Sequence, residues 1–141
     1  MDINIIKCSK KDSEYLENKL VSYNSSKVAF TQDTPFIHMN YKIDSDGKII
    51  AGIKAVLYAW NCLFIDLLFV EEKYRYQGYG KKLLNYIEIE AKKHQCHLIH
   101  LDTFDFQAKD FYLKNGFEVF GILPDCPKGH TRYYMKKTLV R

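Results

Sequence analysis

The sequence lacks cysteine pairs at metal-binding or redox spacing, and it lacks long apolar runs. No Cys-x-x-Cys pair occurs, and the four cysteines, widely separated along the chain, are Cys8, Cys62, Cys96 and Cys126. The first three lie in or beside strand-like runs, so we predict reduced structural thiols in a cytoplasmic protein, although sequence alone leaves disulfide pairing open. No stretch reaches about 18 apolar residues, and the first residues lack a basic start followed by an apolar core. We therefore expect neither a membrane span nor a signal peptide.

Neither positive nor negative charge is concentrated in one part of the sequence. The chain has 21 Lys and Arg against 17 Asp and Glu, a net charge of +4, and no run of basic residues exceeds two. This balance mildly favours small anionic ligands and does not require nucleic acid. A hydrophobic content of 47% over 141 residues allows a substantial core. With no linker or repeat in sight, we expect a single domain over residues 1–141.

The most informative stretch runs from Leu63 to Ala91. Leu63–Val70 has the length and the β-branched and aromatic content of a buried strand, and a charged, glycine-containing turn follows it. From Lys81 the apolar residues recur at helical spacing. A strand, a glycine turn and a helix start place unpaired N–H groups and the positive end of the helix dipole at one spot. This stretch is predicted to bind an anion, most simply a phosphate.

The remaining chain predicts alternating strands and helices around that unit. Residues 44–48 form a hairpin turn, and Val28–Pro35 is either loop or a short helix. The element order is β-α-(α)-β-β-β-α-β-α-β-β, an α/β fold with one mixed sheet. The expected strands are Ile3–Cys8, Phe36–Ile43, Ile49–Tyr58, Leu63–Val70, His97–Thr103, Phe117–Ile122 and His130–Leu139. The expected helices carry Tyr15–Tyr23, Lys81–Ala91 and Gln107–Asn115.

Two motifs in this order resemble the GNAT superfamily of N-acetyltransferases. After the central strand the chain reads Arg75-x-x-Gly78-x-Gly80, which is similar to the family's pyrophosphate-binding signature. Further on, the segment from Ala108 to Phe117 matches the family pattern Ala-x-x-Phe-Tyr-x-x-x-Gly-Phe. The likeness covers about residues 36–120 and implies the GNAT fold, acetyl-coenzyme A (acetyl-CoA) as co-substrate and a homodimer in many members.

The resemblance also implies roles for individual residues. Arg75 would lie against the pyrophosphate or order its loop. Tyr112 stands where many members have the acid that protonates the leaving thiolate, and a phenol is a workable donor. Asp105 replaces an Asn found in many members and would contact pantetheine or face the substrate. The implied pyrophosphate amides belong to Gln77, Gly78, Tyr79, Gly80 and Lys81. The implied pantetheine-pairing residues are Leu68, Phe69 and Val70.

On the acceptor side, the sequence favours Asp66 as the catalytic proton acceptor. It is the one ionisable residue in an apolar run, on a strand face expected to include Leu68 and Val70. The alternative is that Asp66 caps a turn or pairs with a lysine. The loops that would line a substrate cleft on this fold supply further substrate-side candidates. Each of them could equally be an ordinary polar loop residue. These candidates are Asp33, Asp105, Asp125 and His130.

The expected function is therefore transfer of an acetyl group from acetyl-CoA to a primary amine, by direct attack in a ternary complex. The chief alternative is a GNAT-fold module that binds acyl-CoA without turnover. RNA binding is a weaker alternative. We predict no metal site, because His97 and His100 should point to opposite faces of a strand. The sequence does not distinguish an amine of a small molecule from an amine of a protein as the acceptor.

Overall fold

The structure, a computed structural model, describes residues 2–139 and divides the chain into two compact units. The first unit comprises residues 1–31 and the second residues 32–141. Each unit is described by itself below.

The first unit contains one helix, α1 (Lys10–Lys27). Ser9 caps its start: the Ser9 hydroxyl accepts from the Asp12 N–H at 3.1 Å, and the Asp12 carboxylate accepts from the Ser9 N–H at 2.8 Å. None of its side chains is buried, including the apolar ones at helical spacing. The free cysteines comprise all four in the sequence, as expected for reduced thiols.

The predicted strand Ile3–Cys8 is wrong. Residues 2–9 have no regular secondary structure, and Ile3, Ile5 and Ile6 are all exposed. A strand is stable only when a neighbour satisfies its backbone, and no strand of the described chain pairs with this segment. The apolar pattern suggested a strand without showing that it would have a partner.

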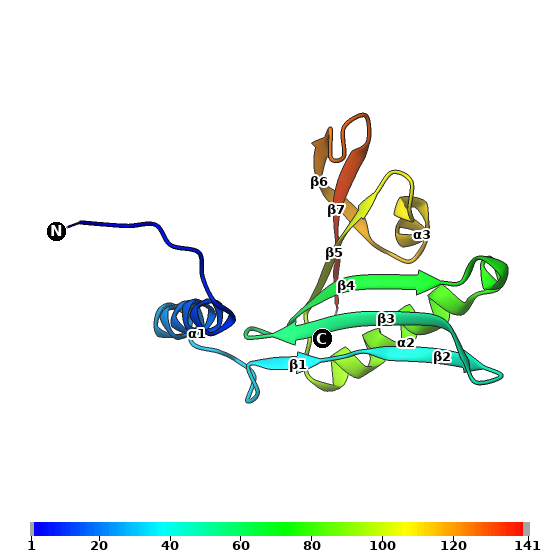
Figure 1. Ribbon diagram of the computed structural model, residues 1–141. Helices are drawn as coiled ribbons and strands as arrows, with labels where there is room; N and C mark the ends of the chain where they lie inside the picture. Colours follow the sequence, from blue (N-terminus) through cyan, green and yellow to red (C-terminus); the bar gives the residue numbers. More distant parts are fainter. Residues whose placement is uncertain (1, 140–141) are drawn as a thin grey trace. The chain divides into compact units, whose positions relative to one another are not determined.

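The second unit is built on a seven-stranded mixed sheet (Figure 1). Along its main path the strand order is β1-β3-β4-β5-β7-β6, and β2 also pairs with β3. All neighbouring pairs are antiparallel except β4 and β5. The strands are β1 (Phe36–His38), β2 (Tyr41–Ser45), β3 (Lys48–Tyr58), β4 (Cys62–Val70), β5 (Leu98–Phe104), β6 (Glu118–Pro124) and β7 (Thr131–Thr138).

The expected strand Phe36–Ile43 is split into β1 and β2. The interruption falls at Met39 and Asn40, where the Asn40 side chain accepts the Ala55 N–H at 3.2 Å in place of a backbone carbonyl. The Met39 N–H still donates to the Ala55 carbonyl at 2.8 Å. The segment therefore stays attached to β3, and β1 and β2 keep the same register against it as far as Ile43.

Two helices and one 3₁₀ turn complete this unit: η1 (Glu72–Tyr74), α2 (Tyr79–Lys93) and α3 (Lys109–Lys114). The buried side of α2 consists of Leu83, Leu84, Ile87 and Ala91, the apolar set that the sequence predicts. This helix packs on β3 and β4 (Figure 1). Residues 28–35 form no helix, so the loop alternative is correct there.

The sheet opens between its two parallel strands. Only Cys62–Phe64 of β4 pair with Leu98–His100 of β5. Beyond these residues β4 continues beside β3 and β5 continues beside β7, but the two no longer pair with each other. The carboxyl ends of β4 and β5 therefore border an opening with unpaired backbone groups on the β4 side.

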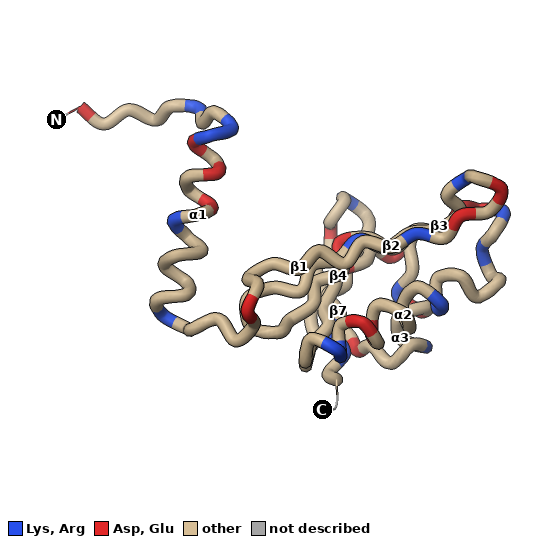
Figure 2. The backbone as a smooth tube through the Cα atoms, turned by 90° about the horizontal axis from the view of Figure 1, so that it is seen from below, with Lys and Arg blue, Asp and Glu red and all other residues tan. Residues whose placement is uncertain are grey.

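Charges of both signs are interspersed along the chain, with no long stretch of one sign (Figure 2). No helix within residues 2–139 combines the length and the apolar content needed to cross a membrane.

The buried side of α2 provides a direct test of this packing. Ile87 is 0% exposed, whereas Ile89 on the same helix is 58% exposed. Ile87→Ala is expected to lower the free energy of unfolding by about 2–5 kcal/mol, because it removes buried methylenes and leaves a cavity. Ile89→Ala, the matched control, should stay within about 0.5 kcal/mol of the parent. Urea unfolding of both variants measures the difference, and equal losses would contradict the packing.

Candidate active site at the open end of the sheet

The connection from β4 to α2 lies at the carboxyl end of β4. Gly78 caps α2 with φ of +87°, a left-handed conformation that glycine adopts without strain. The first helical bond runs from the Lys82 N–H to the Gly78 carbonyl at 3.0 Å. The preceding N–H groups have no acceptor within the helix and point outward from its positive end. The predicted glycine turn and helix start are therefore present.

Arg75 orders this loop from its exposed side. Its Nε donates to the Val70 carbonyl at 2.9 Å, and its guanidinium lies 5.6 Å from the centre of the Phe69 ring. The Gln77 side chain similarly donates to the Lys73 carbonyl at 3.1 Å. Of the two roles implied for Arg75, the structure shows loop ordering. The Nε donor of Arg75 is thus engaged within the protein.

At Gly80 the loop packs closely against α3. A Cβ atom at this position would lie 3.3 Å from Phe111 Cζ and 3.8 Å from Val70 Cγ2. Glycine is therefore needed here for close approach rather than for an unusual φ. Because Phe111 precedes Tyr112, this contact places the start of α2, the end of β4 and the candidate acid in one compact region.

Tyr112 is only 6% exposed and belongs to the core. Its ring contacts those of Phe111 and Phe117 at 5.2 and 5.5 Å between centroids. Burial raises the pKa of Tyr112 to about 12, and the nearby Asp102 carboxylate adds to the rise. The phenol is therefore protonated at neutral pH and can donate a hydrogen bond or a proton.

Asp66 lies in an irregularity of β4. The β3 register pairs Lys54 with Leu67 and Ala55 with Ile65, so Asp66 is the extra residue of a β-bulge. Its side chain is exposed, and no hydrogen bond or ion pair of it is found among the described residues. The predicted strand face shared by Asp66, Leu68 and Val70 is wrong: the bulge turns Leu68 and Val70 toward the core, whereas Asp66 is exposed.

An ion pair that the sequence did not indicate lies across β5 and β7. Arg132 donates from Nε and Nη2 to one Asp102 oxygen, at 3.0 and 2.7 Å. The guanidinium also lies over the rings of Phe104 and Tyr134, at 5.2 and 5.4 Å. The two partners are 30 residues apart and face each other only because β5 and β7 pair. No local pattern carries that information.

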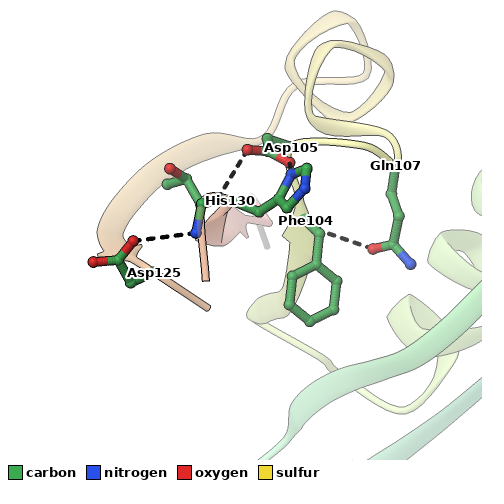
Figure 3. Close-up of polar contacts among 7 residues, drawn as sticks. Phe104, Asp105, Gln107, Asp125 and His130 are labelled. Carbon is green, nitrogen blue, oxygen red and sulfur yellow. Dashed lines mark hydrogen bonds and ion pairs between the residues drawn. The ribbon is translucent and has the colours of Figure 1, made fainter. Parts of the chain in front are cut away.

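Two of the substrate-side candidates form a hydrogen-bonded pair (Figure 3). His130 Nδ1 lies 2.9 Å from Asp105 Oδ1, and Asp105 Oδ2 accepts the Thr131 N–H at 2.9 Å. These bonds lower the pKa of Asp105, with that to His130 contributing most. The Asp105 N–H also donates to the Thr131 carbonyl at 2.9 Å. Asp105 therefore fastens the end of β5 to the start of β7.

The other two candidates are placed differently. Asp125 lies in the same loop as His130, where its Oδ1 accepts the Gly129 N–H at 3.2 Å (Figure 3). Asp33 is exposed and follows Gln32, whose side chain bonds the Leu57 carbonyl and the Asn61 N–H at the amino end of β4. The structure thus brings Asp105, Asp125 and His130 to one end of the sheet and leaves Asp33 at the other. Within residues 2–139, no three His, Cys, Asp or Glu side chains gather as metal ligands would.

A mixed sheet that opens beside a glycine loop and a helix start has the geometry of a phosphate-binding α/β protein. Comparison with known proteins identifies the family. The acetyltransferase (GNAT) family model matches residues 7–117. The chain is also 30% identical over 104 residues to blasticidin-S acetyltransferase of Streptomyces morookaense, covering 73% of this chain and 76% of that protein. The chain therefore belongs to the GNAT family of acetyltransferases.

Solved structures agree with this fold. A Bacillus cereus acetyltransferase is 37% identical, with a TM-score of 0.88 over 97% of this chain and 98% of that one. A protein of Bacillus anthracis strain Ames, solved in complex with acetyl coenzyme A, is 24% identical, with a TM-score of 0.66 over 77% and 65% of the two chains. The chain is thus an acetyltransferase that uses acetyl-CoA, which confirms the predicted family, fold class and enzyme activity.

The left-handed glycine of the loop gives a prediction with a matched control. Gly78→Ala adds a Cβ at φ of +87°, where an L-residue costs about 1–2 kcal/mol. Displacing the amides should weaken acetyl-CoA binding roughly tenfold for each 1.4 kcal/mol lost. Gly47→Ala in the β2–β3 hairpin carries the same strain at φ of +74°, with similarly open surroundings, but should leave the Kd unchanged.

Isothermal titration with acetyl-CoA, coenzyme A and ATP measures both variants. An unchanged Kd in Gly78→Ala, or an equal loss in Gly47→Ala, would contradict binding at this loop.

The raised pKa of Tyr112 predicts a loss of stability in alkali. Below pH 10 the phenol is protonated in both folded and unfolded chains. Above pH 10 it ionises first in the unfolded chain, so stability falls as the pH rises toward the folded value of about 12. The contribution is about 3 kcal/mol over this window.

Tyr112→Phe removes the titrating group. Relative to the parent, the variant should lose less free energy of unfolding between pH 10 and 12, as measured by urea unfolding at several pH values. Parallel curves for the two proteins would show that the phenol is not held protonated by burial.

Proposed function

We propose that the protein acetylates a primary amine of a small molecule, by direct transfer from acetyl-CoA in a ternary complex. The observation that best supports this proposal is the Gly80–Phe111 contact, because Gly80 belongs to the loop expected to hold the pyrophosphate and Phe111 is the chain neighbour of the buried Tyr112. A module that only held acyl-CoA would need the loop but not the neighbouring phenol.

The cofactor is proposed to lie along the open side of β4. The pyrophosphate would meet the amides of residues 77–81, and the pantetheine arm would pair with backbone groups of Leu68–Val70 that β5 leaves free. The carbonyl oxygen of the thioester would then reach the bulge at Asp66, where a β-bulge leaves backbone N–H groups out of the ladder. Those N–H groups would stabilise the oxyanion.

In this mechanism the amine nitrogen attacks the thioester carbon, the new C–N bond forms and the C–S bond breaks. Tyr112 would donate a hydrogen bond to the departing sulfur and pass it a proton. The pKa of Tyr112 is about 12, so transfer of its proton to the sulfur leaves an unfavourable phenolate. The transfer becomes favourable when the phenol regains the proton that the amine nitrogen loses on acylation. Asp66, exposed at the bulge, contributes a carboxylate that attracts the cationic acceptor.

Two observations favour a small acceptor. The relative whose name includes its substrate, blasticidin-S acetyltransferase, is 30% identical to the chain. The acceptor side of the opening also carries exposed carboxylates, Asp66 and Asp125, which suit a cationic amine. An amine panel of blasticidin S, spermidine and L-lysine, assayed by release of coenzyme A thiol, tests this class.

Tyr112→Phe tests the mechanism within this reaction. Loss of the donated proton should lower kcat about 100-fold while leaving the acetyl-CoA KM near its parent value. Tyr86→Phe, the same change on an α2 side chain that is 49% exposed, should alter neither constant.

Steady-state kinetics on the best amine of the panel measures both variants. An unchanged kcat in Tyr112→Phe would contradict the proposed acid, and a parent protein that acetylates none of the amines would contradict the small-molecule proposal.

A further inference from the structure

The pair formed by His130 and Asp105 has the geometry of a carboxylate-supported base. The Nδ1–H of the imidazole donates to the carboxylate, because a carboxylate can only accept. In the neutral ring this bond leaves the lone pair on Nε2. No hydrogen bond to Nε2 is found among the described residues, and the side chain is 50% exposed. An imidazole held in one tautomer, with its second nitrogen open, is suited to accept a proton.

The pair also lies at the end of the sheet where the reaction is proposed to occur. Asp105 directly follows β5, whose carboxyl end borders the opening, and His130 directly precedes β7. The Asp105–Thr131 backbone bond of 2.9 Å fastens these two points together. Since β4 and β5 are parallel, this end is also the one at which β4 leads through the glycine loop into α2.

The surroundings of the imidazole are aromatic. The Phe106 ring meets the His130 ring edge to face at 5.3 Å, and it stacks on Phe104 at 5.2 Å. Phe106 is 59% exposed, although a large apolar side chain usually avoids water. The Gln107 side chain accepts the Phe104 N–H at 3.0 Å and so supports the turn that presents both rings (Figure 3). An exposed aromatic wall beside a base suits an organic ammonium ion.

We infer that His130 is the proton acceptor for the substrate amine, with Asp105 as its positioning residue. This inference rests on the proposed function. The acceptor arrives as R–NH₃⁺, and Nε2 takes one proton to give R–NH₂ and an imidazolium, which then passes the proton to water. After attack, the second proton that the nitrogen loses goes to the sulfur through Tyr112. The products are the acetamide, coenzyme A thiol and one released proton.

The pH dependence separates this assignment from a base at Asp66. An imidazole changes charge between about pH 5 and 8, whereas a carboxylate does so nearer pH 4. With His130 as base, kcat/KM should fall as the pH drops through the imidazole range, because the protonated ring cannot accept. The charged groups around the ring come from three elements. Asp105 accepts its hydrogen bond, and Asp125 and Lys128 lie in its own loop. Arg132 lies on β7 and forms an ion pair with Asp102.

The test uses His130→Gln, Asp105→Asn and Asp66→Asn, with the best amine of the panel. His130→Gln should lose about 100-fold in kcat/KM at pH 7, keep its acetyl-CoA Kd, and lose the fall in rate between pH 8 and 5. Asp105→Asn should lower kcat. The new side-chain amide can donate a hydrogen bond to Nδ1 and so stabilise the tautomer that carries its proton on Nε2, which cannot accept a proton there. Asp66→Asn should raise the amine KM and keep the pH profile.

His94→Gln is the matched control, since His94 is an exposed histidine at the end of α2, and it should behave as the parent. Nitrogen-15 spectra of the imidazoles in the parent protein provide a readout independent of the variants. They should show His130 protonated on Nδ1 and unprotonated on Nε2 at pH 8.

Three outcomes would overturn the inference in an active protein: a parent-like pH profile in His130→Gln, loss of the profile in Asp66→Asn, or the opposite tautomer. A parent protein that acetylates no amine contradicts the proposed function instead, so the two failures are distinguishable.

Discussion

The contact between Gly80 and Phe111 is the constraint on which the rest of the site depends. At this point the backbone of α2 approaches an aromatic ring of α3 and a valine of β4 so closely that no Cβ fits without displacement. The helix start, whose free N–H groups suit a phosphate, is thereby fixed against the helix that carries Tyr112. A larger residue at this position would require the Phe111 ring to shift.

The splay between β4 and β5 complements this contact. Their pairing stops after three residues, so the carboxyl-terminal parts of β4 and β5 do not pair with each other. The β4 edge leads to the glycine loop, and the β5 edge leads to Asp105 and, through β7, to His130. The Asp102–Arg132 ion pair braces the second edge behind the opening. The proposed cofactor loop thus follows β4, whereas the proposed base pair lies at the end of β5 and the start of β7.

Periodic and local features of this protein were readable from sequence. The four core residues of α2 and the left-handed turn before it follow from spacing and glycine, and both are observed. The strand Ile3–Cys8 was not formed, because an apolar pattern cannot specify a pairing partner. The bulge at Asp66 depends on the register against β3, which no single segment encodes. The His130–Asp105 bond joins residues 25 apart and likewise arises only from strand pairing, although both residues were recognisable as polar candidates.

The central claim is that backbone amides at the start of α2 hold the pyrophosphate of acetyl-CoA. Titration of the nitrogen-15-labelled protein with acetyl-CoA, followed amide by amide, tests it most directly. The account predicts that the largest downfield shifts of the amide protons fall on residues 77–81, because these N–H groups gain charged acceptors. Binding with those signals unmoved, and with the main changes on amides elsewhere in the protein, would contradict it.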